Sequence, residues 1–319
     1  MQNLQQINLS EKKAKPRRTL NRHAKKRIFI IVMLAYPLLQ FILFWGYVNF
    51  DTILLTFKSF SWTTGNYTFV GFQNYRSVIN DILNNESTKR MLFNSLLYMP
   101  INSFVILPLS LIFSYFLYKK IPLSGFFRVV YFLPSILPIV VLTMTFGFIF
   151  DSNLGPVNSI LKSVFAIPTA DIPSWFGSYP TSQIMILVYC VWAGLGFNIL
   201  LLSGAIARIP TELIEYGELE GITLFQELKN VVIPLIWPTI TTTFLLGCTA
   251  VFTVLLQPLL LTPDNPYTNT IALSIYNSVI RNGNMAYFAT FGIVVSLIGT
   301  PIIMGIRRAM SKAYQDVDY

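Results

Sequence analysis

The chain has 319 residues, of which 54% are hydrophobic and only 12% are charged, and its formal net charge is +9. Its mean hydropathy of +0.58 excludes an ordinary soluble globular protein, in which about 25% of residues are charged. The composition therefore predicts a protein that crosses a membrane several times.

The N-terminal 27 residues are polar and strongly basic. Nine positive charges lie between Lys12 and Arg27. The segment lacks the small-residue cleavage site of a secretory signal, so we expect residues 1–27 to form a disordered basic tail in the cytoplasm. Nucleic-acid binding is the alternative for such a run of charges, but a basic flank is usual before a membrane-spanning helix.

Apolar runs long enough to span a membrane occur six times, since a transmembrane helix needs roughly 20 residues. The last five contain no Asp, Glu, Lys, Arg or His. The sequence therefore predicts an all-α fold with about six transmembrane helices. The runs lie at 28–57, 91–118, 129–150, 184–205, 235–261 and 286–306.

The distribution of the 23 Lys and Arg residues predicts the topology. Most of them fall on one side when six helices are threaded from an N-terminus in the cytoplasm, so the positive-inside rule predicts that both termini are cytoplasmic. Cys190 and Cys248 lie within predicted spans, so we expect no disulfide framework. The outer segments are then 58–90, 151–183 and 262–285, and 307–319 is a cytoplasmic C-terminal tail.

The spans contain neutral polar side chains beside aromatic rings and prolines. Such groups suit an uncharged solute with many hydroxyls, and prolines at membrane depth are typical of helices beside a wet cavity. The alternative is that the amides bond helices to one another. The candidate residues for a translocation path are Asn94, Tyr98, Asn102, Phe197, Asn198, Thr253 and Gln257. The prolines are Pro100, Pro108, Pro134, Pro138 and Pro258.

The segment between the fourth and fifth spans, Ile209 to Pro238, carries five Glu residues. Charges are costly in lipid, so this acidic loop must lie in water, and its pattern indicates a docking surface. We expect Thr211 to be a helix N-cap, another backbone to approach Gly217, and Gly221 to form a left-handed turn. A second short helix is predicted over 223–230. An ordinary amphipathic surface loop is the alternative.

No catalytic residues, metal ligands or cofactor site are predicted for this chain. The sequence offers no arrangement of nucleophile, base and orienting group, no zinc or haem ligand spacing and no Gly-Lys phosphate loop. Any ATP must therefore bind to another subunit. Proton or sodium coupling is disfavoured because the last five spans lack ionisable groups.

The acidic loop resembles the "EAA" loop of binding-protein-dependent ABC importer permeases, which reads Glu-Ala-Ala, three residues, Gly, nine residues and Ile-x-Leu-Pro. Here the same spacing gives Glu215-Tyr216-Gly217, then Gly221, then Val231-x-Ile233-Pro234. Tyr216 and Gly217 replace the two alanines. Further segments are similar to sugar-type permeases in the same order: FVGFQNY (69–75), GFFRVVYFLPSILPIVV (125–141), WAGLGFNILLLSGAIARIP (192–210) and TPDNP (262–266).

This resemblance implies a type I ABC importer fold in the cytoplasmic (inner) membrane, with residues 91–306 as the permease core and 209–234 as a coupling loop. It implies a second permease subunit, with a heterodimer favoured, two ATPase subunits that bind ATP and Mg, and an extracytoplasmic solute-binding protein. No nucleic-acid partner is expected. The implied coupling residues are Glu215, Tyr216, Gly217, Glu218 and Gly221.

The function that follows is the transmembrane permease subunit of an ATP-driven importer for a sugar or oligosaccharide. One alternative keeps the machine and changes the cargo to another small organic solute, such as a phosphate ester. Another is a carrier or pore that needs no ATPase. A membrane scaffold without transport is a third, but it leaves the polar faces of the proline-containing helices unexplained.

Overall fold

The computed structural model describes residues 22–61, 65–282 and 284–313, so most of the predicted basic tail and the last six residues lie outside the described part. The chain divides into two units, 1–52 and 53–319. α1 (Arg22–Gln40), the π-helical segment η1 (Phe41–Tyr47) and α2 (Val48–Leu55) follow one another without a break, and the last three residues of α2 belong to the second unit. The helix begins at Arg22, so residues 22–27 of the predicted tail are helical.

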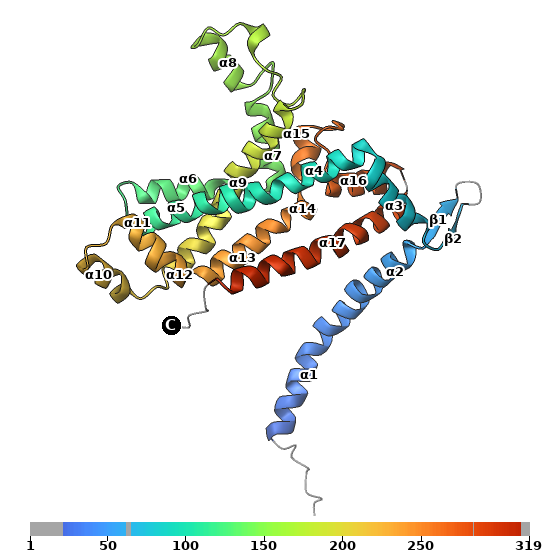
Figure 1. Cartoon of the computed structure of the whole chain (residues 1–319), viewed down its shortest axis with the longest axis horizontal. Helices are drawn as coiled ribbons and strands as arrows, with labels where there is room; N and C mark the ends of the chain where they lie inside the picture. The colour runs from blue at the N-terminus through green and yellow to red at the C-terminus, as the bar shows by residue number, and fades with distance from the viewer. Residues whose placement is uncertain (1–21, 62–64, 283, 314–319) are drawn as a thin grey trace, which may run out of the picture. The chain divides into compact units, whose positions relative to one another are not determined.

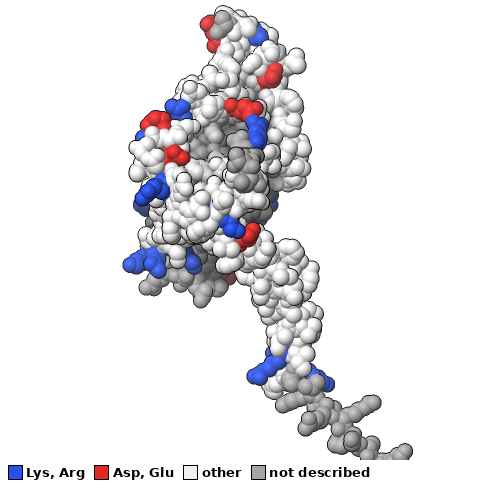
Figure 2. Space-filling model, turned by 90° about the vertical axis from the view of Figure 1, so that its right-hand side faces the viewer, with Lys and Arg blue, Asp and Glu red and all other residues white. Residues whose placement is uncertain are grey.

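The helix formed by α1, η1 and α2 is apolar and exposed. From Lys25 to Leu55 it is long and apolar enough to cross a membrane, and no residue is buried in its most apolar stretch of 18 residues. Figure 2 shows an uncharged surface along most of its length, with Lys and Arg at its N-terminal end. A surface of this kind needs lipid or another protein around it.

The second unit is helical apart from one antiparallel pair of short strands in which Lys58 faces Phe69 (Figure 1). Its first half comprises β1 (Lys58–Ser61), β2 (Asn66–Phe69), α3 (Gln73–Asn84), α4 (Glu86–Ile101), η2 (Asn102–Ile106), α5 (Leu107–Tyr118), α6 (Ser124–Ile136), α7 (Ile139–Ile149), α8 (Pro156–Ser163), η3 (Thr169–Asp171) and α9 (Thr181–Ile206). Its second half comprises α10 (Thr211–Leu219), α11 (Leu224–Glu227), η4 (Leu228–Val232), α12 (Ile233–Leu235), α13 (Trp237–Cys248), α14 (Ala250–Thr253), α15 (Leu256–Leu261), α16 (Ile271–Asn277), η5 (Ser278–Asn282) and α17 (Met285–Ser311).

Among the described residues, four helices are long and apolar enough to cross a membrane, and the number rises to six if each of two bent pairs is one span. The unbent helices are Lys25–Leu55, Glu86–Tyr118, Thr181–Ile206 and Met285–Ser311. The bent pairs join Ser124–Ile136 to Ile139–Ile149 at 107° and Leu224–Leu235 to Trp237–Thr253 at 79°. Each of the six predicted spans overlaps one of these segments, but the third and fifth are broken.

Proline explains why the spans differ. Leu137 has extended backbone (ψ 144°) because it precedes Pro138, which disfavours the helical conformation, so α6 ends there. Pro100 and Pro108 instead lie within one unbent span. They flank the π-helical segment η2, in which the N–H of Leu107 bonds to the carbonyl of Asn102, and this wider turn absorbs the clash that a proline ring causes.

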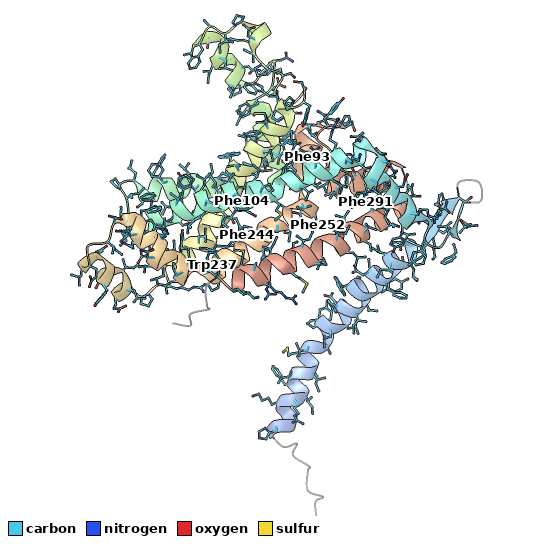
Figure 3. The ribbon with its side chains drawn as sticks, in the orientation of Figure 1. Phe93, Phe104, Trp237, Phe244, Phe252 and Phe291 are labelled. Carbon is cyan, nitrogen blue, oxygen red and sulfur yellow. The ribbon has the colours of Figure 1, made fainter. Side chains whose placement is uncertain are left out.

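In the second unit, α10, α12 and the C-terminal end of α17 lie at one end of the bundle, and α3 and α16 lie at the other (Figure 1). Helices cross between these ends with aromatic rings in the contacts (Figure 3). Phe104 meets Phe244 of α13 edge to face at 6.0 Å. The indole Nε1 of Trp237 donates to the carbonyl of Met310 at 2.8 Å. These contacts fix α13 between the α4–α5 helix and α17.

Helices α6 and α9 cross closely at Gly196. A Cβ atom at this position would lie 2.6 Å from the carbonyl oxygen of Tyr131 and 2.8 Å from Oγ of Ser135. Gly204, farther along α9, has no atom within 4 Å of the same position. The crossing at Gly196 is therefore possible only because this residue lacks a side chain.

We expect Gly196→Ala to lower the thermal midpoint of the detergent-purified protein, because an added methyl group forces the helices apart at a typical cost of about 1–3 kcal/mol. Gly204→Ala is the matched control, and it is expected to be neutral or to stabilise by up to about 1 kcal/mol through helix propensity. Equal midpoints for the two variants would show that α6 and α9 do not pack as described.

Candidate functional site

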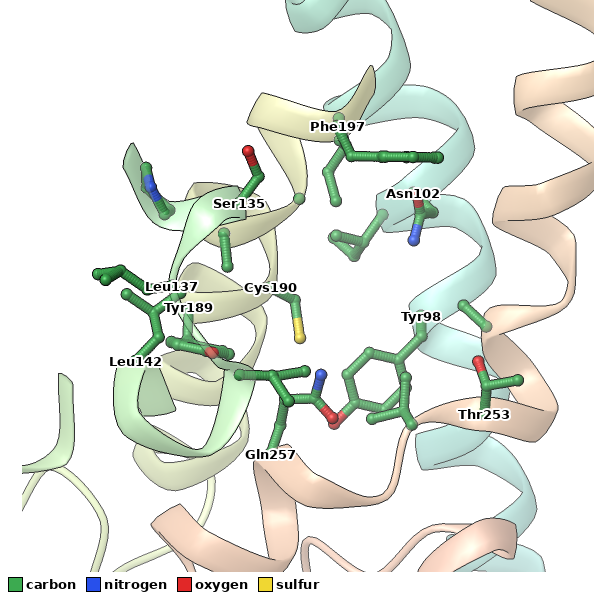
Figure 4. Close-up of a pocket in the computed structure, with 18 residues that line it drawn as sticks. Tyr98, Asn102, Ser135, Leu137, Leu142, Tyr189, Cys190, Phe197, Thr253 and Gln257 are labelled. Carbon is green, nitrogen blue, oxygen red and sulfur yellow. The ribbon is translucent and has the colours of Figure 1, made fainter. Parts of the chain in front are cut away.

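A cavity of about 470 Å³, open on one side, lies between the α4–η2 helix, the α6–α7 break, α9 and the α14–α15 break. Five of the seven residues predicted for a translocation path line it, and Figure 4 shows their side chains around one space. These five are Tyr98, Asn102, Phe197, Thr253 and Gln257. The structure thus brings together residues from four separate helices.

The cavity lies where two of the helices are interrupted. Leu137 at the α6–α7 break and Val254 at the α14–α15 break both line it. The carbonyl of Val254 accepts a hydrogen bond from Oγ1 of Thr270 at 2.7 Å. Irregular backbone at membrane depth is tolerated only against protein or a wet cavity. The breaks therefore occur beside the cavity because their backbone groups need hydrogen-bond partners.

The cavity wall is polar but uncharged. None of the residues that line it is Asp, Glu, Lys, Arg or His. Hydroxyl, amide and aromatic groups are present, and in Figure 4 Tyr98 and Gln257 point toward each other across the space. The Tyr98 hydroxyl also accepts a long hydrogen bond from Nε2 of Gln183 at 3.5 Å. A wall of this kind can hydrogen-bond and stack on a neutral polar molecule, and the volume falls within the usual range for small-molecule sites.

Two residues predicted for the path lie elsewhere. Asn94 is fully buried, and its Nδ2 donates to the carbonyls of Tyr267 and Asn269 at 2.7 and 3.0 Å. The amide of Asn198 donates to the carbonyl of Gly194 in its own helix at 2.8 Å. Neither residue lines the cavity, so of the three candidates in the second predicted span only Tyr98 and Asn102 contribute to it. Asn94 instead fastens the loop before α16 to α4.

Several lining residues were not predicted from the sequence. Tyr189, Cys190 and Gly194 join Phe197 on the cavity face of α9. Their spacing of one, five and eight residues after Tyr189 places them on one side of a helix. This spacing can be read from the sequence, but it is a weak indication of a cavity, because a stripe of small and aromatic residues also occurs on buried helix faces. Tyr189 is held by a hydrogen bond from Oγ1 of Thr143 at 2.7 Å.

The acidic loop forms a compact helical hairpin. Gly221 has φ +73°, which confirms the predicted left-handed turn. The N–H of Ile222 bonds to the carbonyl of Gly217 at 3.3 Å, and the N–H of Gly221 bonds to the carbonyl of Glu218 at 3.1 Å. This pair of bonds is a Schellman motif, which satisfies the last carbonyls of α10.

Two predictions within this loop were wrong. The space beside Gly217 holds the side chain of Ile222, whose Cδ1 would be 2.7 Å from an added Cβ, and not another backbone. Thr211 is the first residue of α10; the N-cap is Pro210, which makes no side-chain capping bond. Thr223 is the residue that caps a helix here, through a capping box with Gln226. That helix, α11 with η4, matches the one predicted over 223–230.

The surface of the hairpin combines exposed apolar and acidic side chains. Tyr216 is 67% and Leu219 is 86% exposed, while Ile214 is buried in the cluster that joins α10 to α5 and α9. Glu215 is also exposed. An exposed apolar patch rimmed by charge is typical of a docking surface. Of the other predicted docking residues, Glu218 contacts Lys119 of this chain at 2.9 Å, and Gly217 and Gly221 shape the turn.

The sequence and fold were compared with those of known proteins. A family model described as "Binding-protein-dependent transport system inner membrane component" matches residues 106–314. The probable ABC transporter permease protein YurN of Bacillus subtilis is 27% identical over 82% of this chain and 89% of its own length. The multiple sugar-binding transport system permease protein MsmF of Streptococcus mutans is 25% identical over 88% of this chain and 94% of its own.

Among solved structures, a chain of a bacterial alginate ABC transporter in complex with an alginate pentasaccharide-bound periplasmic protein has the same fold. Its TM-score is 0.76 with 17% sequence identity, and the match covers 92% of this chain and 98% of that chain. The fold described above is therefore that of a chain of an ABC transporter.

We expect Asn94→Ala to destabilise the purified protein, because each buried carbonyl that loses its donor typically costs about 1–3 kcal/mol. Asn198→Ala removes a bond within a single helix, so its effect should stay within about 0.5 kcal/mol. Thermal unfolding of the two variants in the same detergent tests this difference. An Asn94→Ala midpoint equal to that of the unaltered protein would contradict the structural role.

Proposed function

The chain belongs to the family of binding-protein-dependent transport system inner membrane components, and we propose that it is the transmembrane permease subunit of an ATP-driven importer for a sugar or oligosaccharide. The observation that carries this proposal is the uncharged, hydroxyl- and amide-lined cavity at the two helix breaks. A neutral solute with many hydroxyls finds both hydrogen-bonding partners and aromatic faces there.

The relatives support the class of cargo. MsmF is named as a multiple sugar-binding permease, and the solved transporter of the same fold imports the acidic polysaccharide alginate, so both support a saccharide as the class of cargo. The charge of the cargo is argued from this chain alone: no lining residue of the cavity is charged, and a buried anion is unfavourable without a cation beside it. A neutral saccharide is therefore favoured over a phosphate ester for this chain.

The acidic loop is proposed as the site where a cytoplasmic ATPase docks. Its exposed carboxylate Glu215 and the ring of Tyr216 would meet a basic and apolar socket on that subunit. The charges around this end of the bundle support a cytoplasmic location, since Lys119, Lys120, Arg307 and Arg308 surround it in a chain subject to the positive-inside rule. Both termini would then be cytoplasmic.

We propose the remaining partners from the chain's membership in this family. A second permease, with a heterodimer favoured, would complete the pathway, two ATPase subunits would bind ATP and Mg, and a solute-binding protein would deliver cargo on the outer face. The solved transporter binds a periplasmic protein, which supports the last of these for the present chain.

The proposed mechanism is alternating access. Movement of the docked acidic loop would tilt the helices that reach the cavity, and the breaks at Leu137 and Val254 would let half-helices pivot without breaking hydrogen bonds inside a helix. Tyr98, Asn102 and Gln257 would hold the solute while access changes from one side of the membrane to the other.

We expect Glu215→Ala to uncouple the transporter without preventing membrane insertion. Removing one partner of a charge pair that docking buries typically costs about 3–5 kcal/mol, so the ATPase subunit should dissociate more readily and uptake into proteoliposomes should fall. Glu86→Ala, which removes an exposed carboxylate at the start of α4, away from the acidic loop, is the control. Normal solute-stimulated ATPase activity and uptake in the Glu215→Ala complex would refute the docking role, and transport by the purified chain without any ATPase would favour a carrier or pore.

Gln257→Leu tests the cavity. It should raise the KM for uptake of the neutral oligosaccharide that the cognate binding protein retains, because an unpaired solute hydroxyl costs about 1–3 kcal/mol, or roughly 5- to 150-fold. Basal ATPase activity should not change. Thr242→Val, which removes an exposed hydroxyl bonded within its own helix, should leave the KM unchanged. An unaltered KM in Gln257→Leu would place the solute elsewhere.

A further inference from the structure

A three-residue ion cluster connects the end of α5 to both helices of the acidic loop. Nζ of Lys119 lies 2.9 Å from Oε1 of Glu218 and 2.9 Å from Oε2 of Glu227. The exposed fraction of the side chain is 62% for Glu218, 17% for Lys119 and 2% for Glu227. The cluster therefore runs from solvent into the interior, and we call it the Lys119 cluster.

The inner half of the Lys119 cluster lies against apolar side chains. Glu227 directly precedes Leu228, which packs with Tyr115, Ile214 and Val232 in one buried group. A carboxylate in such surroundings is strongly unfavourable unless a cation pairs with it. Burial lowers the pKa of Lys119, but its bonds to Glu227 and Glu218 outweigh that effect and leave the pKa raised, so the ammonium keeps its charge at neutral pH.

A buried ion pair is weak evidence for stability, because well-packed apolar residues in its place are often equally stable or more so. The geometry of this one indicates a different role. Lys119 follows the last residue of the unbent helix Glu86–Tyr118, which also supplies Tyr98 and Asn102 to the cavity. Glu218 lies in the last turn of α10, and Glu227 ends α11.

We propose that Lys119 is a positioning residue that holds α10 and α11 against the end of α5, so that movement of the acidic loop is carried along the α4–α5 helix to the cavity. The inference rests on the proposed function, in which α10 receives the motion of an ATPase. Glu218 then acts within this chain as an anchor for α10, and Glu215 and Tyr216 are left to contact the partner.

The test uses the assembled transporter in proteoliposomes. In the double variant Lys119→Met and Glu227→Met, apolar side chains of similar length replace the buried pair, so folding should be retained. We expect the ATPase subunits to stay bound and to hydrolyse ATP, while the amount of oligosaccharide imported per ATP falls about tenfold, a usual size for coupling between sites. Lys119→Arg keeps the charge and should retain most of the coupling. Lys120→Met is the control at the neighbouring exposed lysine.

A distance measurement separates this inference from the proposed function. Spin labels at positions 123 and 220, both exposed, report the position of α10 relative to the end of α5. The distribution of distances should be narrow in the unaltered protein and in Lys119→Arg, and broad in the double variant. A narrow distribution or an unchanged import ratio in the double variant would overturn the role of Lys119. Absence of ATP-dependent import by the unaltered complex would instead refute the proposed function, and the distance distribution would still decide whether Lys119 holds α10.

Discussion

The structure depends on one constraint, namely that backbone polar groups in an apolar bundle must find partners inside the protein. An unbroken helix satisfies these groups with hydrogen bonds along its own backbone. At each break, another group must supply the missing hydrogen bond. At the α14–α15 break the hydroxyl of Thr270 supplies one to the carbonyl of Val254, and the hydroxyl of Thr262 bonds to Thr268 in the following loop. The α6–α7 break lies across the same cavity. The cavity thus lies beside two of the places where helices are interrupted.

The positions of the charged residues follow from the same constraint, because a charge is costly inside an apolar bundle. Arg281 and Asp264 pair near the end of the bundle that holds α16, and Lys119 pairs with Glu218 near the end that holds α10. Glu227 departs from this pattern because it is buried, and it is tolerated because the ammonium of Lys119 lies beside it. Because these ion pairs lie near the two ends of the bundle, the cavity wall is uncharged. The proposal of a neutral cargo depends on this property.

The sequence was sufficient for features whose cause is local. The six apolar runs, the left-handed Gly221 and five cavity residues follow from hydropathy, turn chemistry and helical spacing. Features that need a distant partner were not predictable. Asn94 bonds to carbonyls more than 170 residues away, so nothing near it in the sequence distinguishes it from Asn102. Ile222 fills the space beside Gly217 because the Schellman turn directs its side chain back toward α10. The third predicted span is broken at Leu137, because the residue before a proline disfavours the helical conformation.

The bundle contains unbroken helices and helices that are interrupted at the cavity. The helix Glu86–Tyr118 and α9 run without a break past the cavity, and they pack together at the end that holds α10, where Tyr115, Leu202 and Ile206 share one buried cluster. Close packing makes such a pair move as a unit. The α6–α7 and α14–α15 breaks border the same cavity, and the helices on either side of each break can change angle there. In the proposed mechanism, a displacement applied at α10 reaches the cavity through the unbroken helices and is accommodated at the breaks, so that the site can open alternately to two sides.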